Sequence, residues 1–170
     1  MTQDVYTREG KRPDWDEYFL NIMQEVGKRG TCDRGRSGAV AVKDKRILST
    51  GYVGAPTGLF HCDDAGHMMK KTMHEDGSVH EHCVRTTHAE QNIVCQAAKN
   101  GISLDGATLY VKMTPCFSCA KMIINAGIKR VVCLRRYHED SDTIQMLKEA
   151  RVELYFIENG YEKYDRQKVN

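Results

Sequence analysis

The chain has 170 residues, of which 41% are hydrophobic and 28% are charged, with a formal net charge of +2. This length fits one domain with a buried core, and the balanced charge lacks the basic stripe of a nucleic-acid-binding protein. Because of that charge balance we do not expect a nucleic acid as a partner. No apolar run could span a bilayer, and the polar N-terminus does not resemble a signal peptide, so we do not expect a membrane as a partner either. Seven cysteines is an odd number that favours thiols or metal ligands over disulfides, and we expect a cytoplasmic protein.

The first half of the chain predicts one helix and one hairpin. Residues 1–13 form a polar arm, and a helix is predicted from Asp14 to Lys28, where apolar residues recur at helical spacing. Two strand-like runs follow, SGAVAVKD and RILSTGYVG, and the short polar turn between them predicts an antiparallel hairpin. Residues 55–87 then have no clean period but hold five of the seven histidines. A structureless stretch of this length inside a compact domain needs a special reason.

From His88 onward, predicted helices and strands alternate. They are a helix from His88 to Asn100, strand ATLYVKM, a helix from Pro115 to Ala126, strand RVVCL, a helix from Thr143 to Ala150, and strand VELYFI. This order predicts an α/β sheet flanked by helices, and the last two strands should be parallel because a right-handed crossover joins them. We therefore expect a single domain over residues 14–158, with a His/Cys-rich insertion at 55–87 and a polar tail or short helix at 159–170.

Two short motifs, HAE and TPCFSC, stand at the predicted starts of two helices. Thr114 suits a helix cap and Pro115 the first helical position, so Cys116 and Cys119 should share one face of the first turn, where free N–H groups favour thiolates. Together with His88 they make three protein ligands, and zinc prefers four, which leaves a position for water. A C-x-x-C pair alone is also typical of redox proteins, but the HAE motif at a second helix start favours zinc.

Glu90 lies two positions after His88, on the same inward stripe as Val94 and Ala97. A carboxylate in a first turn is often only a helix cap. The combination of H-x-E with P-C-x-x-C, however, is the known signature of zinc nucleobase deaminases, in which the glutamate is the acid and base and not a ligand. We therefore interpret Glu90 as the catalytic residue, which takes a proton from a water whose pKa zinc lowers toward about 7.

The stretches HAEQN and TPCFSCAKMIINAGIKRVV, with the order of strands and helices, resemble the cytidine/deoxycytidylate deaminase superfamily, and within it the deoxycytidylate (dCMP) deaminase branch. The likeness runs from WDEYF to VELYFI and includes GYVGAPTGL, HCVRTTHAE and RRYHEDSD. It implies a three-layer cytidine-deaminase-like α/β fold, with a five-stranded mixed sheet, helices on both faces, and zinc between two helix starts. It also implies hydrolysis of dCMP to dUMP and ammonia, which supplies dUMP for dTMP synthesis, in a homo-oligomer that is often a hexamer and sometimes regulated by dCTP and dTTP.

The same resemblance implies which residues bind the substrate. The carbonyl of Thr114 or Pro115 accepts a hydrogen bond from the leaving amine, and we expect Ala89, Tyr137 and Arg34 to bind the nucleotide as well. The aromatic pair Tyr137 and His138 could stack on the base or lie on the surface. The cations available for a phosphate are Arg34, Arg36, Lys70, Lys71, Arg135 and Arg136.

One position departs from the family pattern. Family members usually read G-Y-N-G where this chain has Val53, and the missing asparagine ordinarily hydrogen-bonds the nucleotide sugar. Val53 cannot form that bond, so sugar selectivity, phosphate state and regulation stay open.

Three further cysteines, Cys32, Cys62 and Cys83, fall outside the first ligand set. Some dCMP deaminases, including phage and bacterial forms, carry a structural zinc, and Cys32 and Cys62 match the positions of two of its cysteines. Cys83 is a further sulfur candidate and His82 the expected nitrogen ligand. Because adjacent residues bind one metal only with awkward geometry, His67, His74 and His80 could each replace His82.

A closed four-ligand zinc would order the insertion, because metal-binding free energy becomes folding free energy. The three cysteines could instead be simply buried thiols. We expect the remaining pair, Cys95 and Cys133, to lie in the core.

Other functions fit the same motifs. Zinc deaminases that act on CMP, dCTP, free cytosine or tRNA adenosine share HAE and P-C-x-x-C, although the net charge of +2 argues against tRNA. A non-catalytic zinc module that binds a nucleotide fits them too. The intact Glu90 argues against such a module, because it needs no acid or base.

Overall fold

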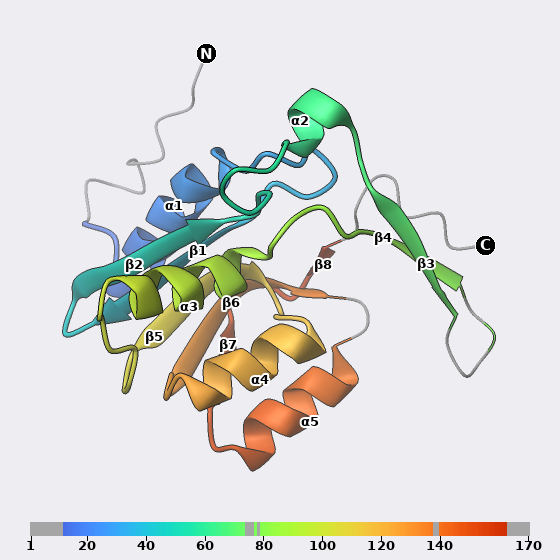
Figure 1. The fold of residues 1–170 in the computed structure, drawn as a ribbon. Coiled ribbons are helices and arrows are strands. Elements are labelled where there is room, and N and C mark those ends of the chain that lie inside the picture. The colour runs from blue at the N-terminus through green and yellow to red at the C-terminus, as the bar shows by residue number, and fades with distance from the viewer. Residues whose placement is uncertain (1–11, 74–76, 78, 138–139, 163–170) are drawn as a thin grey trace.

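Five strands run through the middle of the fold in the order β2-β1-β5-β6-β7 (Figure 1). β1 is antiparallel to both β2 and β5, whereas β5, β6 and β7 are parallel, so the prediction of a mixed sheet with its last two long strands parallel is confirmed. The computed structural model describes residues 12–73, 77, 79–137 and 140–162. The five strands are β1 (Gly38–Lys43), β2 (Arg46–Tyr52), β5 (Thr108–Met113), β6 (Arg130–Tyr137) and β7 (Glu153–Phe156).

Helices cover both faces of this sheet and complete the predicted three layers (Figure 1). Side chains alternate along a strand, so Val40 and Val42 of β1 pack in a cluster with Phe19 of the first helix. Ala39 and Ala41 belong to the larger cluster under the other three helices. The four helices are α1 (Trp15–Gly27) on one face, and α3 (Ala89–Lys99), α4 (Phe117–Asn125) and α5 (Ser141–Glu149) on the other.

The insertion at residues 55–87 contains more regular structure than its sequence pattern indicates. It includes a one-turn helix, α2 (Cys62–Ala65), and an antiparallel hairpin of β3 (Met69–Met73) and β4 (Val79–Cys83) that projects beyond the sheet (Figure 1). Every residue of β3 is exposed. A strand with water on both faces has no alternation of apolar and polar residues, which is why no strand period is visible in β3.

The start of α4 differs from the prediction. The helix begins at Phe117 with Cys116 as its N-cap residue, so Thr114 is not the cap and Pro115 is not the first helical residue. A capping hydroxyl must reach an N–H group two or three residues ahead. The Thr114 hydroxyl instead donates to Asp140, on the loop before α5, at 2.8 Å.

One smaller expectation was also wrong, and the structure adds a detail to another. Cys95 is exposed, because it lies on the outer side of α3, while Ile93 and Ala97 face the core. The expected polar tail begins with a short strand, β8 (Tyr161–Glu162), which pairs in parallel with the end of β6. The rest of that tail, residues 163–170, and residues 1–11 of the N-terminal arm lie outside the described residues. Among the helices that are described, none is long and apolar enough to cross a membrane.

Candidate active site and metal centres

The two sequence motifs meet where α3 and α4 begin. Nδ1 of His88 lies 3.5 Å from Sγ of Cys116 and 3.5 Å from Sγ of Cys119. A tetrahedral zinc with bonds of about 2.1 Å to nitrogen and about 2.3 Å to sulfur separates such ligand atoms by about 3.6 Å. The three side chains therefore fit a zinc ion, as the sequence predicted, and they leave its fourth position open.

Close packing against β2 sets the start of α3. A side chain at Gly51 would collide with the carbonyl oxygen of Ala89, so glycine is what lets the helix approach the strand. The side-chain amide of Asn92 donates to the carbonyl oxygen of Tyr52 at 2.7 Å, and the Gln91 side chain accepts from the N–H of His88 at 2.9 Å. These contacts fix the backbone that presents His88.

Glu90 is half-buried beside this group. Burial raises the pKa of its carboxyl above the ordinary value, against the effect of the nearby His88. A hydrogen bond from the Cys119 thiol lowers the pKa of Cys116 to about 4, which favours the thiolate form that binds metal. The site thus combines a metal-ready thiolate with a carboxyl that can hold a proton.

A second group brings together Cys32, Cys62, His67 and Cys83, whose ligand atoms all lie within 4.8 Å of one another. Sγ of Cys62 and Sγ of Cys83 are 3.5 Å apart, and Nδ1 of His67 lies 3.7 Å from Sγ of Cys32. These separations suit a tetrahedral ion with four protein ligands, which leaves no open position.

The nitrogen in the second group comes from His67, not from the expected His82. Side chains alternate along β4, so with Cys83 turned toward the group, His82 faces the other side of the ribbon. Two more histidines of the insertion were candidates for this nitrogen. They are His74 and His80, and neither His74 nor the side chain of His80 is among the described parts of the chain.

Sequence reasoning missed Asp33, which follows Cys32 directly. Its carboxylate lies 3.0 Å from Nε2 of His67. A carboxylate on the outer ring nitrogen fixes a histidine as a metal ligand, because it leaves the inner nitrogen free of its proton. The sequence offered one signal, since Asp33 is an acidic residue next to the candidate ligand Cys32. Only the fold shows that Asp33 contacts His67.

Comparisons with known proteins agree with this geometry. The family model described as "Cytidine and deoxycytidylate deaminase zinc-binding region" matches residues 13–135. The chain belongs to this family. A deoxycytidylate deaminase of Mycobacterium phage D29 is 41% identical over 124 residues, which cover 71% of this chain and 94% of the relative. ComE operon protein 2 of Bacillus subtilis is 36% identical over 148 residues, or 87% of this chain and 74% of the relative.

A solved structure supports the same assignment. The crystal structure of dCMP deaminase from the cyanophage S-TIM5, in complex with dCMP and dUMP, has a TM-score of 0.69 and 31% sequence identity to this chain. The match covers 86% of this chain and 99% of that one. The fold and the family predicted from the sequence are confirmed.

Some of the residues expected to bind the substrate of this deaminase lie next to the first metal group in the chain, and others do not. Ala89 is the first residue of α3, and the buried pair Thr114 and Pro115 leads into Cys116. Tyr137 ends β6, and its N–H donates to the Thr114 hydroxyl at 3.2 Å. Its neighbour His138 lies outside the described residues.

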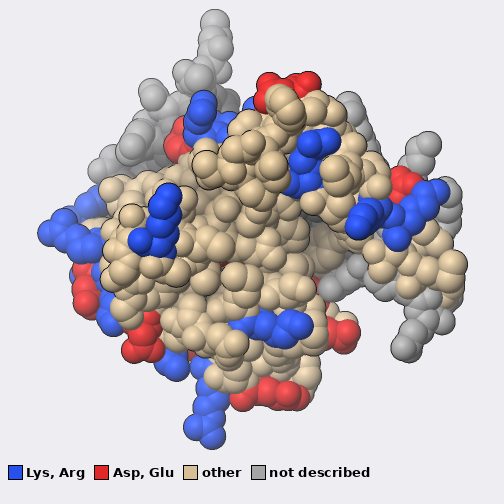
Figure 2. All heavy atoms as spheres, in the orientation of Figure 1, with Lys and Arg blue, Asp and Glu red and all other residues tan. Residues whose placement is uncertain are grey.

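Most of the predicted phosphate cations already have partners in the structure. Arg34 donates to the backbone oxygen of Glu81 in the hairpin at 3.3 Å, so its described contact is beside the second metal group. Lysines and arginines form separate groups on the face in Figure 2, some of them at the end that holds α2 and the hairpin. Four of the other predicted cations form ion pairs: Arg36 with Asp63, Lys71 with Glu81, Arg135 with Glu158, and Arg136 with Asp140. The remaining one, Lys70, is exposed on β3.

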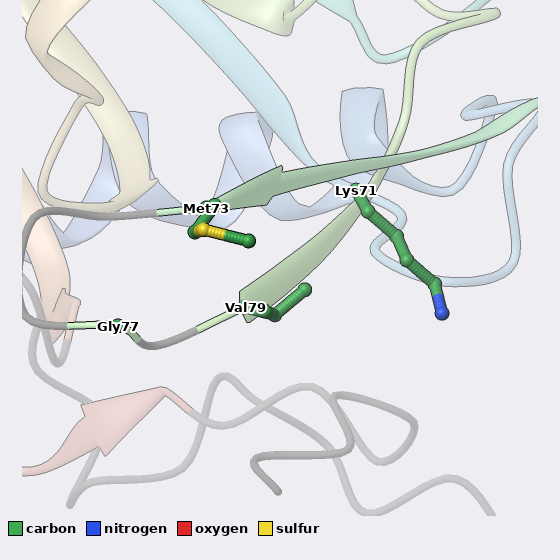
Figure 3. Close-up of a pocket in the computed structure, with 4 residues that line it drawn as sticks. All are labelled: Lys71, Met73, Gly77 and Val79. Carbon is green, nitrogen blue, oxygen red and sulfur yellow. The ribbon is translucent and has the colours of Figure 1, made fainter.

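A pocket of about 550 Å³ lies on the hairpin, lined by Lys71, Met73, Gly77 and Val79 (Figure 3). None of these residues belongs to either metal group. This hollow is therefore a feature of the projecting ribbon and not of the deaminase site.

Val53, the departure from the family pattern, serves the scaffold. Its N–H donates to the oxygen of Ser37 at 2.9 Å, its oxygen accepts from Thr31 at 3.0 Å, and only 9% of the residue is exposed. The valine side chain packs toward Gly30. An apolar side chain at this position gives the site no polar contact to a sugar.

Proposed function

We propose that this protein hydrolyses dCMP to dUMP and ammonia with the help of a zinc ion held by His88, Cys116 and Cys119. The observation that carries the proposal is a three-ligand group with the half-buried Glu90 beside it. Relatives named deoxycytidylate deaminase, and a dCMP deaminase crystallised with dCMP and dUMP, support the choice of nucleotide.

Residues of the chain divide the chemistry among them. When bound, zinc supplies a Lewis acid that makes the attacking water more acidic. Glu90 takes one proton from that water and gives it to N3 of the pyrimidine as a C–O bond forms at C4. It then takes the proton of the new C4 hydroxyl and gives it to the amine, so that the C–N bond breaks, C4 becomes a carbonyl, and ammonia leaves. Its raised pKa suits this exchange, because the neutral carboxylic acid is then accessible. In this proposal the carbonyl of Thr114 or Pro115, just before Cys116, accepts a hydrogen bond from the departing amine.

The proposal includes a second zinc ion on Cys32, Cys62, His67 and Cys83. Four protein ligands close the coordination shell, which is the pattern of a structural site. Burial alone would raise the pKa of Cys83. Hydrogen bonds from the backbone of Arg85 and Met68 and from the side chains of Cys62 and His67 together lower this pKa to about 7, which favours the thiolate. Because Cys32 lies near α1 and Cys83 ends the hairpin, this ion would join the insertion to the body of the domain.

Three further properties belong to the proposal as inferences from family resemblance. They are a homo-oligomer, with a hexamer favoured, regulation by dCTP, and regulation by dTTP. A cytoplasmic location is also part of the proposal, and it rests on the composition of the chain. The sugar and phosphate preferences have to be measured, because Val53 removes a polar contact that the family pattern would place there.

A substrate panel tests the function. Ammonia release is measured with dCMP, CMP, dCTP, cytosine and tRNA, alongside zinc per chain. We expect dCMP to be turned over fastest and two zinc ions to be bound per chain. If no cytosine nucleotide is turned over, the proposed function is wrong, and a single zinc per chain removes the structural site.

A further inference from the structure

Asp140 is a buried carboxylate that the mechanism above does not use. Only 3% of the residue is exposed. Its Oδ2 accepts hydrogen bonds from the Thr114 hydroxyl at 2.8 Å and from Nε of Arg136 at 3.0 Å, and its Oδ1 accepts from the Arg136 guanidinium at 2.7 Å. A buried charge is costly unless it is paired and hydrogen-bonded, and these partners meet that condition.

The position of Asp140 in the chain suggests a different role from the one it has. It is the N-cap residue of α5, and its backbone oxygen accepts from the N–H of Ile144 at 2.8 Å. An aspartate at this position normally turns its carboxylate to an N–H group of its own helix. This one makes no such bond and turns instead to Thr114. The carboxylate therefore ties two segments together and does not serve as a cap.

The Thr114 end of this link lies in the loop that carries the zinc ligands. Thr114 is 2% exposed and comes directly after β5, two residues before Cys116. Its hydroxyl donates to Asp140 and accepts from the N–H of Tyr137 at 3.2 Å. With both its proton and a lone pair engaged, the side chain is held in one orientation between Asp140 and Tyr137, next to the peptide that joins Thr114 to Pro115.

The Arg136 end reaches the last strands. The guanidinium of Arg136 lies 5.6 Å from the ring centroid of Phe156 in β7 and 5.2 Å from that of Tyr161 in β8. Its backbone N–H donates to the oxygen of Gly160 at 2.9 Å. The two aromatic rings and the Asp140 carboxylate all contact the guanidinium group and hold Arg136 in place. Arg136 in turn holds Asp140.

We propose that Asp140 is a positioning residue for the deamination: through Thr114 it keeps the carbonyls of Thr114 and Pro115, and Sγ of Cys116, in the geometry that the reaction needs. The inference rests on the proposed function, since it concerns the placement of groups in that site. It predicts that loss of Asp140 slows turnover while substrate binding persists, because contacts to the departing amine strengthen only as the amine leaves.

The test is a double-mutant cycle with Asp140→Asn and Thr114→Val, both close in size to the parent side chains. For each variant kcat and KM are measured per zinc-loaded chain, together with zinc content and hydrogen exchange at the Tyr137 amide. We expect kcat to fall roughly 10- to 100-fold with KM changed less than about threefold. The double variant should be no slower than the slower single variant, because both changes cut one link.

Two matched variants separate positioning from general stability. Thr114→Ser keeps the hydroxyl and should restore most of kcat and the protection of the Tyr137 amide, whereas Asp142→Asn makes the same change on an exposed carboxylate of α5 and should leave both unchanged. The proposal is overturned if the variants melt earlier but keep the parent kcat per zinc-loaded chain, or if the two losses in kcat multiply. If the parent does not act on dCMP, the proposed function fails separately, and the cycle is run on whichever panel substrate the parent turns over.

Discussion

The two cysteine–histidine groups differ in the number of ligands they supply and in the elements that supply them. His88, Cys116 and Cys119 stand at the starts of two helices that pack on the sheet, so the rigid core sets their positions. The second group draws its four ligands from loops, a one-turn helix and a two-stranded ribbon, and no described residue of these segments belongs to the two main buried clusters. A site supported by the core can therefore leave one coordination position of its metal open for chemistry. A site built from loops and a hairpin uses all four coordination positions to hold those segments together.

The largest expected effect separates the groups by catalysis. Glu90→Gln keeps the shape of the side chain but cannot take or give the proton, so we expect kcat to fall about 100- to 10,000-fold. Zinc content should stay at the parent value, because Glu90 is not in either ligand set. Steady-state kinetics and metal analysis measure the two quantities. Glu25→Gln, which alters an exposed carboxylate on α1, is the control, and parent-like kcat in Glu90→Gln would remove this residue from the mechanism.

The second prediction tests the other group by stability. Cys83→Ser should remove about one zinc per chain and lower the free energy of unfolding by about 4 kcal/mol or more, because loss of a structural metal is among the largest single-site effects. The folded fraction that keeps its first zinc should still turn over substrate. Urea unfolding with metal analysis measures the change, and Cys95→Ser, on an exposed cysteine outside both groups, is the control. Full zinc content in Cys83→Ser would contradict a four-ligand site.

The third prediction decides between two histidines. His67→Gln should weaken the second metal more than about 100-fold, since loss of a ligand exceeds the effect of losing an outer partner. His82→Gln should keep that metal, because its side chain faces away from the group. Zinc competition with a chromogenic chelator measures both affinities. The opposite result would restore the assignment made from sequence.

A smaller effect is expected one step further from the metal. Asp33→Asn keeps the size of the side chain but weakens its hold on Nε2 of His67, so we expect the second metal to bind about 10- to 100-fold less tightly. The same chelator competition measures it. Asp44→Asn is a suitable control, because Asp44 lies in a hairpin turn with a positive φ of 50° that asparagine also adopts. Equal zinc affinity in Asp33→Asn and the parent would show that His67 is oriented without this carboxylate.

The smallest effect should leave both groups intact and so provides a baseline for them. Asp16 of α1 accepts two hydrogen bonds from Arg130, at 2.8 and 2.7 Å, and these bonds hold the pKa of Asp16 below its ordinary value. Asp16→Asn should cost about 2 kcal/mol of stability near neutral pH without loss of zinc or kcat.

A lowered folded-state pKa stabilises the fold above the unfolded value of about 3.9 and ceases to do so as pH falls through the folded value. The difference between the parent and Asp16→Asn should therefore be full at pH 6 and shrink below about pH 4. Urea unfolding over this range measures it, with Asp142→Asn as a variant whose difference should stay small. A difference that does not depend on pH would assign the effect to packing.

Much of the scaffold could be predicted because its signals are local. The helix near the N-terminus has its apolar spacing in one stretch, and the structure adds a local cap, because Asp14 accepts from the N–H of Glu17 at 2.8 Å. A short polar turn at Asp44 separates two strand-like runs, so the antiparallel hairpin could be predicted directly. The hairpin of β3 and β4 could not, because every residue of β3 is exposed and this strand has no buried face to create a pattern.

By itself, the sequence determined the family, the three candidate ligands of the first metal group and the role proposed for Glu90, since these residues stand in short motifs at fixed spacing. Only the tertiary structure decided that His67 and not His82 completes the second group, that Asp33 contacts His67, and that Asp140 binds Thr114 and not its own helix. The physical reason is distance along the chain. Spacing within a motif fixes which side chains share a helix turn, whereas contacts between distant segments depend on how strands pair and which face each side chain takes.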